Sequence, residues 1–108
     1  MPNKDLLRVT LDVNADIIEF SEGASIITGY SSSEVVGKNW FKLFIPEENF
    51  DEVSAVFQGF LGGNLSFWEY TNRIICKDGL TCVVKWKNFL RRDAHNNPIA
   101  IHSEGNLI

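Results

Sequence analysis

The sequence predicts an α+β domain, with an antiparallel sheet of five strands and several helices gathered on one face. Alternation of bulky and charged residues between 67 and 92 indicates two strands joined by a tight turn. Apolar residues at three- and four-residue spacing between 46 and 61 indicate one long amphipathic helix. The order of elements, strands first, then helices, then strands joined by hairpins, places that helix on the apolar side of the sheet.

The central hairpin runs from Phe67 to Arg92 and is hinged at residues 77–79. A two-residue turn would put the apolar sets of its strands on opposite sides of the sheet. We therefore expect a three-residue turn with Gly79 in the left-handed conformation. That register pairs Tyr70 with Trp86, Glu69 with Lys87, and Phe67 with Phe89.

Two asparagines, Asn72 and Asn88, fall among the aromatic residues on the apolar face of this hairpin. A buried amide needs hydrogen-bond partners. In one interpretation both side chains reach backbone groups or lie near the wet ends of the strands. In the other they face a cavity and contact a ligand, because small-molecule sites are apolar walls with a few placed polar groups. The sequence leaves both interpretations open.

The N-terminal half is predicted to contain short elements. Alternating residues indicate a strand over 6–13 and a second over 17–20, separated by a turn. Helical segments should follow at 22–28 and 38–45, and a capping box from Ser31 to Glu34 starts another that ends at Gly37.

The long helix is expected to begin at Pro46, because proline suits the first helical position, and to end at Gly62-Gly63. Its apolar stripe is core, although Phe57 or Phe60 could also contact a ligand. A polar loop at 93–98 leads into a last strand over 99–107, where small residues at 103 and 105 leave space over the sheet or let the helix approach.

Composition excludes several classes of function. A chain of 108 residues with 44% apolar and 22% charged residues suits one soluble globular domain. A net charge of -4 argues against nucleic-acid binding. No apolar run approaches the ~20 residues of a membrane span, and the start is no signal peptide. We therefore expect a cytoplasmic domain without membrane contact.

Cysteine and histidine usage gives no sign of a metal site. Cys76 and Cys82 would lie diagonally on neighbouring strands, farther apart than an unstrained disulfide allows, so free thiols are expected. An enzyme is disfavoured because no serine or cysteine has a base placed within reach of it by the expected elements. The carboxylates at 47, 48, 51 and 52 belong to a helix start.

Several segments form an ordered set along the chain: 12–18, 28–31, 34–40, 43–48, Arg73 with Lys77-Asp78-Gly79, and Trp86 followed seven residues later by Asp93. Taken together, they resemble the PAS family, the sensory-box domains of bacterial-type signalling proteins, over essentially the whole chain. The resemblance implies the sheet order 2-1-5-4-3, a pocket between the sheet and the long helix, and a role as a signal-input or dimerisation module.

The end of the chain departs from the family pattern. The family closes its last strand with Gly-x-Asp-Ile-Thr before an effector, whereas here Gly105-Asn106-Leu107-Ile108 carries leucine in place of the aspartate. By this resemblance residues 1–108 are one sensory domain excised from a larger protein, such as a two-component system. A histidine kinase or cyclic-dinucleotide enzyme would lie outside the chain.

The resemblance also restricts cofactors. The light-sensing flavin branch needs a cysteine after Gly-x-Asn, but Gly37-Lys38-Asn39 is followed by Trp40, and the flavin-contacting asparagine of that branch falls at Val84. A covalent flavin photoadduct is therefore disfavoured, and a non-covalent flavin redox sensor stays the less favoured alternative. Haem is disfavoured because no histidine lies between 46 and 73, while His95 and His102 lie away from the pocket.

The predicted function is therefore a non-catalytic sensory module whose pocket holds a small ligand or is filled by its own aromatic side chains. The rival hypothesis is a ligand-free dimerisation module, a symmetric homodimer formed through the outer sheet face. The candidate pocket comprises Trp40, Phe44, Phe57, Phe60, Trp68, Tyr70, Asn72, Trp86, Asn88 and Ser103, and the candidate dimer interface comprises Phe67, Ile75, Val83 and Phe89.

Overall fold

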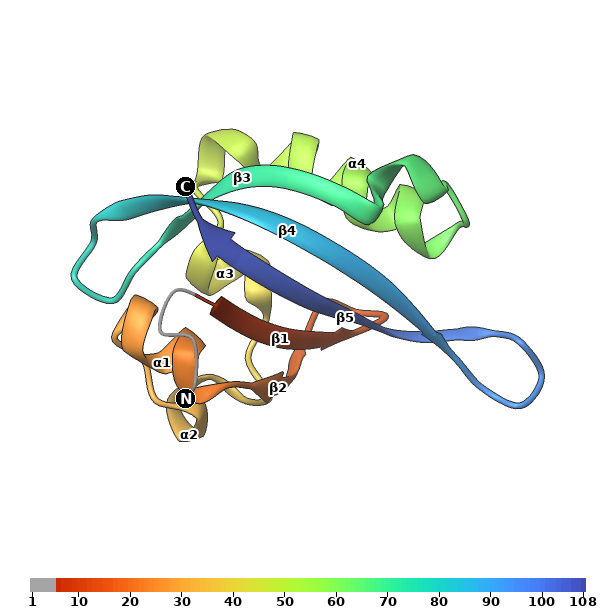
Figure 1. Cartoon of the computed structure of the whole chain (residues 1–108), viewed down its shortest axis with the longest axis horizontal. Helices are drawn as coiled ribbons and strands as arrows, with labels where there is room; N and C mark the ends of the chain where they lie inside the picture. The colour runs from red at the N-terminus through yellow and green to blue at the C-terminus, as the bar shows by residue number, and fades with distance from the viewer. Residues whose placement is uncertain (1–5) are drawn as a thin grey trace.

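The computed structural model of the chain describes residues 6–108. Five strands form one antiparallel sheet in the order β2-β1-β5-β4-β3, which confirms the predicted fold class and the order implied by the resemblance (Figure 1). The strands are β1 (Leu6–Asp12), β2 (Ile17–Phe20), β3 (Glu69–Ile75), β4 (Thr81–Arg92) and β5 (Pro98–Leu107).

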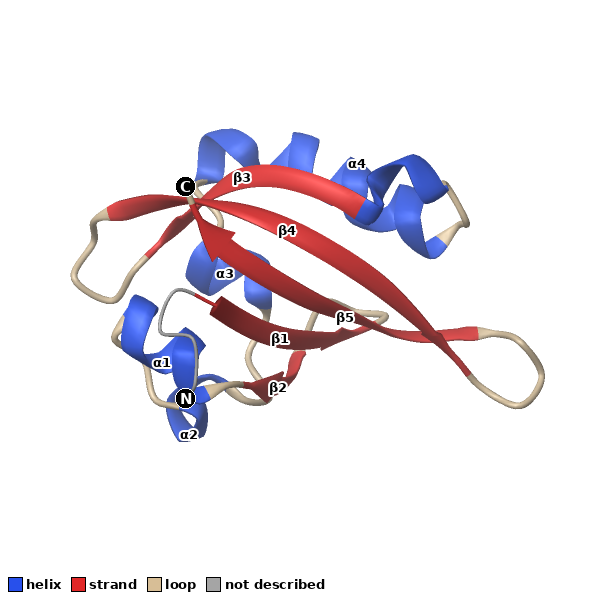
Figure 2. Cartoon of the chain, viewed as in Figure 1, coloured by secondary structure: helices blue, strands red, loops and turns tan. Residues whose placement is uncertain are grey.

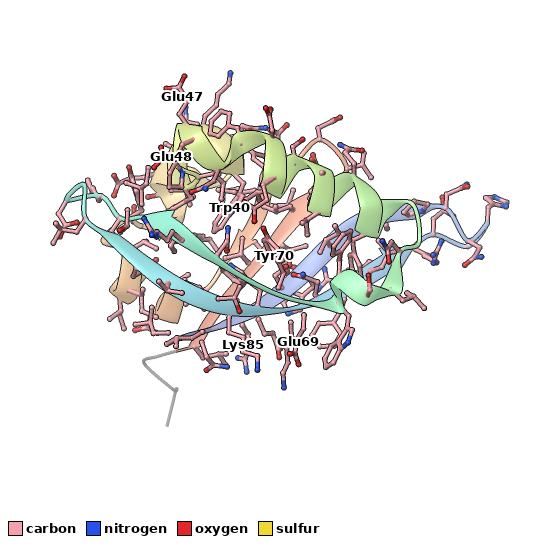
Figure 3. All side chains as sticks on the ribbon, turned by 90° about the horizontal axis from the view of Figure 1, so that it is seen from above. Trp40, Glu47, Glu48, Glu69, Tyr70 and Lys85 are labelled. Carbon is pink, nitrogen blue, oxygen red and sulfur yellow. The ribbon has the colours of Figure 1, made fainter. Side chains whose placement is uncertain are left out.

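The helices cover one side of this sheet, which we call the inner face (Figure 2). Figure 3 shows α4 lying over the inner face, while Glu69 and Lys85 project from the opposite, outer face. The helical elements are α1 (Glu22–Thr28), α2 (Ser32–Val35), α3 (Trp40–Phe44), η1 (Glu47–Asn49), α4 (Phe50–Leu61) and η2 (Leu65–Trp68).

The short helices form near the predicted positions, but α2 ends at Val35 before the predicted Gly37, and α3 covers only Trp40–Phe44 of the predicted 38–45. The Ser21 side chain accepts a hydrogen bond from the Ala24 backbone N–H at the start of α1, and Gly29 ends that helix with φ of 83°. Ser31 and Glu34 form the predicted capping box at α2. The Lys77 ammonium also lies 2.7 Å from Glu34 Oε2, so the β3–β4 turn is tied to this helix.

The start of the long helix differs from the prediction. Pro46 precedes a 3₁₀ turn, η1, and α4 begins only at Phe50. The Asn49 backbone N–H donates to the Pro46 carbonyl at 2.9 Å, a three-residue span, and Asn49 itself is bent out of helical geometry with φ of -105° and ψ of 2°. The predicted end is confirmed, since Gly62 caps α4.

The register of the central hairpin is as predicted. Glu69 pairs with Lys87 and Tyr70 pairs with Trp86, and Gly79 takes the left-handed conformation with φ of 88°. The even-numbered residues Ile74, Val84 and Trp86 are buried on the inner face. The three-residue turn therefore keeps both apolar sets on one side of the sheet.

The predicted strand start at Phe67 is wrong, and so is its pairing with Phe89. Residues 65–68 form the 3₁₀ turn η2, because the Asn64 side chain accepts a hydrogen bond from the Ser66 backbone N–H at 3.2 Å. The turn carries Trp68 out of the sheet, and its side chain is 48% exposed.

Gly105 provides the space over the middle of the sheet, and the Trp86 ring fills it. A Cβ at Gly105 would meet two atoms of the Trp86 ring at 2.7 Å and a Val84 methyl at 2.5 Å. Residue 105 faces residue 86 directly across β5 and β4. The missing side chain therefore lets the indole lie flat against the backbone of β5.

Cys76 and Cys82 are free thiols in the structure. Their sulfur atoms lie 3.8 Å apart, closer together than a diagonal pair of strand residues suggests. Burial raises the pKa of the Cys82 thiol to about 11, and the neighbouring Cys76 adds to the shift. Cys82 is therefore protonated at neutral pH.

Candidate ligand-binding cavity

A cavity of about 70 Å³ lies between the inner face of the sheet and the helices α3 and α4. This volume gives room for roughly five water molecules or a small organic molecule. Its lining comes from β1 (Val9, Leu11), α3 (Trp40, Phe41), α4 (Val53, Val56, Phe57, Phe60), β3 (Tyr70, Asn72), β4 (Trp86, Asn88) and β5 (Ile101, Ser103).

Most of the predicted pocket residues reach this cavity. The lining contains Trp40, Phe57, Phe60, Tyr70, Asn72, Trp86, Asn88 and Ser103 from the predicted set. Their placement agrees with the sequence analysis, and their contact with a ligand stays a prediction.

Two of the predicted pocket residues do not line the cavity. Phe44 is fully buried on the far side of Trp40, stacked on Phe20 at 5.8 Å between ring centroids. Trp68 lies in η2 and points toward solvent. The residues that the prediction missed are Val9, Leu11, Phe41, Val53, Val56 and Ile101, most of which follow the strand alternation and helix stripe already noted.

Aromatic rings fix the shape of the walls. Trp40 meets Trp86 edge to face, with centroids 5.7 Å apart and planes at 80°. Phe41 meets Phe57 in the same way at 5.9 Å and 83°. Such arrangements match the charge distribution of aromatic rings and stabilise each pair beyond its buried area. The cavity is therefore held open by rings that support one another across α3, α4 and β4.

The two asparagines turn out to have different surroundings. The Asn88 amide is held at both ends: Nδ2 donates to the Phe67 carbonyl at 3.0 Å, and Oδ1 accepts from the Ser103 hydroxyl at 2.7 Å. Asn72 has one such bond, in which its Oδ1 accepts from Trp86 Nε1 at 2.8 Å. The Asn88 side chain therefore links β4 to η2 and β5, while the Asn72 amide can still form further hydrogen bonds.

A groove adjoins the cavity where β3 approaches the start of α4. Glu48, Asn49 and Glu52 line its helix side. The groove and the cavity share Val53, Tyr70 and Asn72. Figure 3 shows Tyr70 between the sheet and α4. The lining of this groove on the sheet side also includes Thr71, Arg73 and Val83.

Tyr70, which lines both the groove and the cavity, makes a hydrogen bond to α4. Its hydroxyl donates to Glu52 Oε1 at 2.6 Å, which joins β3 to α4. Burial raises the pKa of Tyr70 to about 12, and the Glu52 carboxylate contributes to the rise. The phenol therefore keeps its proton at neutral pH and remains a hydrogen-bond donor.

Removing this hydrogen bond should loosen the contact between β3 and α4. In Tyr70→Phe, we expect amide hydrogen exchange in β3 and the first turn of α4 to accelerate roughly 2–10-fold, the equivalent of one net hydrogen bond. Tyr30→Phe makes the same chemical change at a tyrosine outside the cavity and should leave those rates unchanged. Equal exchange rates in Tyr70→Phe and the unmodified protein would show that this hydrogen bond does not hold β3 and α4 together.

The outer face carries charged residues in pairs and a few exposed apolar ones. Arg91 lies 2.9 Å from Glu19, and Lys85 lies 3.5 Å from Glu69. Phe89 is 47% exposed and Val83 is 39% exposed on this face, whereas Ile75 is half-buried.

One residue of the predicted interface is misplaced. Phe67 packs beneath α4, where its ring comes within 2.8 Å of the position that a Cβ would take at Gly59. The residue belongs to η2 and not to the outer sheet face. His102 does lie on the outer face, as predicted, with Nδ1 2.8 Å from the Thr10 hydroxyl.

The chemistry of the cavity suits binding. All of its lining residues are uncharged. The Ser103 hydroxyl donates its proton to Asn88 and has no base beside it in the lining. Within residues 6–108, no cluster of three histidine, cysteine or acidic residues is placed to hold a metal ion. In the same residues, no helix has the length and apolarity needed to cross a membrane.

Comparisons with known proteins agree with this geometry. The sequence matches the family model described as the PAS fold over residues 17–103. A search of curated proteins gave no match. A tryptophan-to-alanine variant of the PAS-B domain of Cycle from Drosophila melanogaster, solved with bound glycerol, superposes with a TM-score of 0.80 at 11% identity, covering 94% of this chain and 99% of that chain.

Two further solved structures are similar. The PAS domain of the quorum-sensing receptor RpfR from Cronobacter turicensis, in complex with C12:0, has a TM-score of 0.78 and 21% identity, covering 100% of this chain and 98% of that chain. A light-oxygen-voltage domain studied with a flavin analogue has a TM-score of 0.73 and 26% identity, covering 94% of this chain and 76% of that chain. Because the family model matches most of the sequence, the chain belongs to the PAS-fold family.

Proposed function

We propose that this PAS domain is a sensory module that binds a small, mostly apolar organic molecule between α4 and the sheet. The observation that carries the proposal is the cavity of about 70 Å³, whose aromatic and aliphatic walls hold a few polar groups. That composition is typical of small-molecule sites. The RpfR domain in complex with C12:0 and the Cycle domain with glycerol support a ligand-binding role.

The sheet offers a route by which occupancy can reach an effector. Trp86 and Asn88 face the cavity from β4, while their neighbours Lys87 and Phe89 face outward on the same strand. A ligand that displaces the inner residues therefore also moves the outer face. It shifts the balance between two conformations only as far as it binds one of them more tightly. In this proposal the effector belongs to the same cytoplasmic protein and is an enzyme such as a histidine kinase or a cyclic-dinucleotide enzyme.

Native mass spectrometry of freshly purified protein tests this function, together with a thermal-shift screen of small neutral and acidic metabolites. A ligand at 100 times its Kd stabilises a protein by about 2.7 kcal/mol, which is roughly 10 °C or more for a domain of this size. We expect either a co-purified mass or a shift of this order. Apo mass alone, with no shift across the screen, would contradict the proposal.

A dimerisation module is the second candidate, and the exposed Phe89 on the outer face favours it. A large ring among charged residues is a common feature of interfaces. Phe89→Glu should weaken self-association at least about tenfold in sedimentation velocity, because a charge would replace a ring that is buried in the dimer. Ile26→Glu, at an exposed apolar residue of α1, should not. A protein that stays monomeric at high concentration would remove this candidate.

A non-covalent flavin is less well supported. Trp40 stands where the light-sensing branch carries its reactive cysteine, and its ring packs against Trp86 and fills that part of the interior. A visible flavin absorption band in the purified protein would reverse this assessment.

A further inference from the structure

We propose that Asn72 makes the cavity selective for neutral molecules that present a hydrogen-bond acceptor, such as the carbonyl of a ketone, ester or lactone on a short apolar body. The inference rests on the proposed function, because it requires a ligand in the cavity. Beyond the proposed function, it names the chemical class of the ligand and the side chain that recognises it.

The orientation of the Asn72 amide is fixed by Trp86. An amide presents an acceptor oxygen and a donor nitrogen, and its partners decide which way each points. An indole N–H can only donate, so the 2.8 Å contact with Trp86 Nε1 holds Oδ1 toward the indole. The indole is 6% exposed and lies between Trp40 and the backbone at Gly105. Trp86 therefore cannot turn away and release the amide.

The Asn72 nitrogen is left available. Among residues 6–108 it makes no hydrogen bond, although each buried side-chain nitrogen and oxygen there has a partner. Nδ2 must then be reachable by a small molecule and not sealed in protein. Asn72 lines both the cavity and the adjoining groove, so Nδ2 offers its N–H groups to whatever enters.

The other polar groups of the lining are already engaged. Tyr70 donates its proton to Glu52, and Ser103 donates its proton to Asn88. The Asn88 nitrogen donates to the Phe67 carbonyl. In the described part of the lining, Asn72 Nδ2 is thus the donor nitrogen without a partner, and a ligand that matches it must bring an acceptor.

Charge argues for a neutral ligand. No lysine, arginine or histidine lines the cavity, so a carboxylate inside it would lose hydration without gaining an ion pair. Glu48 and Glu52 border the groove against a single basic residue, Arg73, which disfavours entry of an anion. A protonated amine only donates hydrogen bonds, so it could not accept one from Asn72 Nδ2. A neutral carbonyl avoids both penalties.

The test uses four probes of similar size: methyl butyl ketone, the alkene with CH₂ in place of its carbonyl oxygen, hexanoate and hexylamine. Binding to the full chain is followed by NMR through the Asn72 side-chain NH₂ and Trp86 indole signals. We expect the ketone to shift the Asn72 NH₂ signals and the alkene to leave them nearly unchanged. This comparison needs no variant and is therefore independent of any folding defect.

A variant then removes the donor. Asn72→Asp keeps an oxygen for Trp86 and replaces the free N–H groups with a carboxylate oxygen, which accepts hydrogen bonds only and repels a carbonyl. It should weaken ketone binding about tenfold and change alkene binding less than about twofold. Asn106→Asp makes the same chemical change at an exposed residue of β5 and should alter neither affinity.

The outcomes separate this inference from the proposed function. If ketone and alkene bind but respond equally to Asn72→Asp, the inference fails and ligand binding stands. Hexanoate binding more tightly than the ketone would overturn the neutral class, as would a co-purified ligand that lacks an acceptor. If no probe binds and the purified protein carries no ligand, the proposed function fails as well.

Discussion

Replacing Trp86 with alanine is expected to lower the free energy of unfolding by about 3–5 kcal/mol, the cost of deleting a buried aromatic side chain from a packed core. The indole is 6% exposed, packs edge to face against Trp40 and covers Gly105. Its loss would also leave the Asn72 oxygen without its donor and enlarge the cavity. Urea unfolding followed by circular dichroism measures the change.

Trp68→Ala is the matched control for this prediction. Its side chain is 48% exposed in η2, so its removal should cost less than about 1 kcal/mol. Comparable decreases in the free energy of unfolding of the two variants would mean that both tryptophans are buried. Trp86→Phe refines the measurement, because it retains most of the ring volume and removes only the N–H that orients Asn72.

Phe44→Ala should lower the free energy of unfolding by a similar amount, about 3–5 kcal/mol, although Phe44 itself does not line the cavity. Phe44 is 0% exposed and contacts three rings, with centroid distances of 5.8 Å to Phe20, 5.3 Å to Tyr30 and 4.4 Å to Trp40. The cluster joins α3 to β2 and to the segment after α1. At 4–8 °C per kcal/mol, the midpoint of thermal unfolding should fall by at least about 12 °C.

Phe89→Ala serves as the control for the core cluster, since Phe89 is 47% exposed on the outer face and its truncation should change stability by about 0.5 kcal/mol or less. A small effect of Phe44→Ala would show that the α3 cluster collapses around the deletion. Such a collapse would move Trp40 into the space left by the Phe44 ring and change the shape of the cavity. The NMR signals of Asn72 would report that change.

The sequence predicted the hairpin because two independent constraints agreed there. Alternation put the bulky residues on one face, and only a three-residue turn kept them together, which led to the observed pairing of Tyr70 with Trp86. The same alternation gave no warning that Trp68 lies outside the strand. A local hydrogen bond from the Ser66 backbone N–H to the Asn64 side chain begins a competing turn there, and periodicity does not show where a strand starts.

Site prediction failed where it depended on distant partners. Alternation and helical spacing found the aromatic walls, but a helix as short as α3 does not show that Trp40 faces the cavity and Phe44 lies behind it. The two asparagines have the same residue type on the same face. Asn88 is engaged by Phe67, 21 residues earlier in the chain, and Asn72 by Trp86, 14 residues later, and neither partner was predicted.

The sheet order has a consequence for folding during synthesis on the ribosome. Leu6 pairs with Asn106, and Arg8 with Glu104, so β1 cannot pair with β5 until about 100 further residues have been synthesised. At about 5–20 residues per second, translation needs on the order of 5–20 s to deliver that partner. During that interval the first strand has only the short β2 beside it, with its other edge unpaired. Nascent chains should therefore gain protease resistance abruptly, when β5 leaves the exit tunnel.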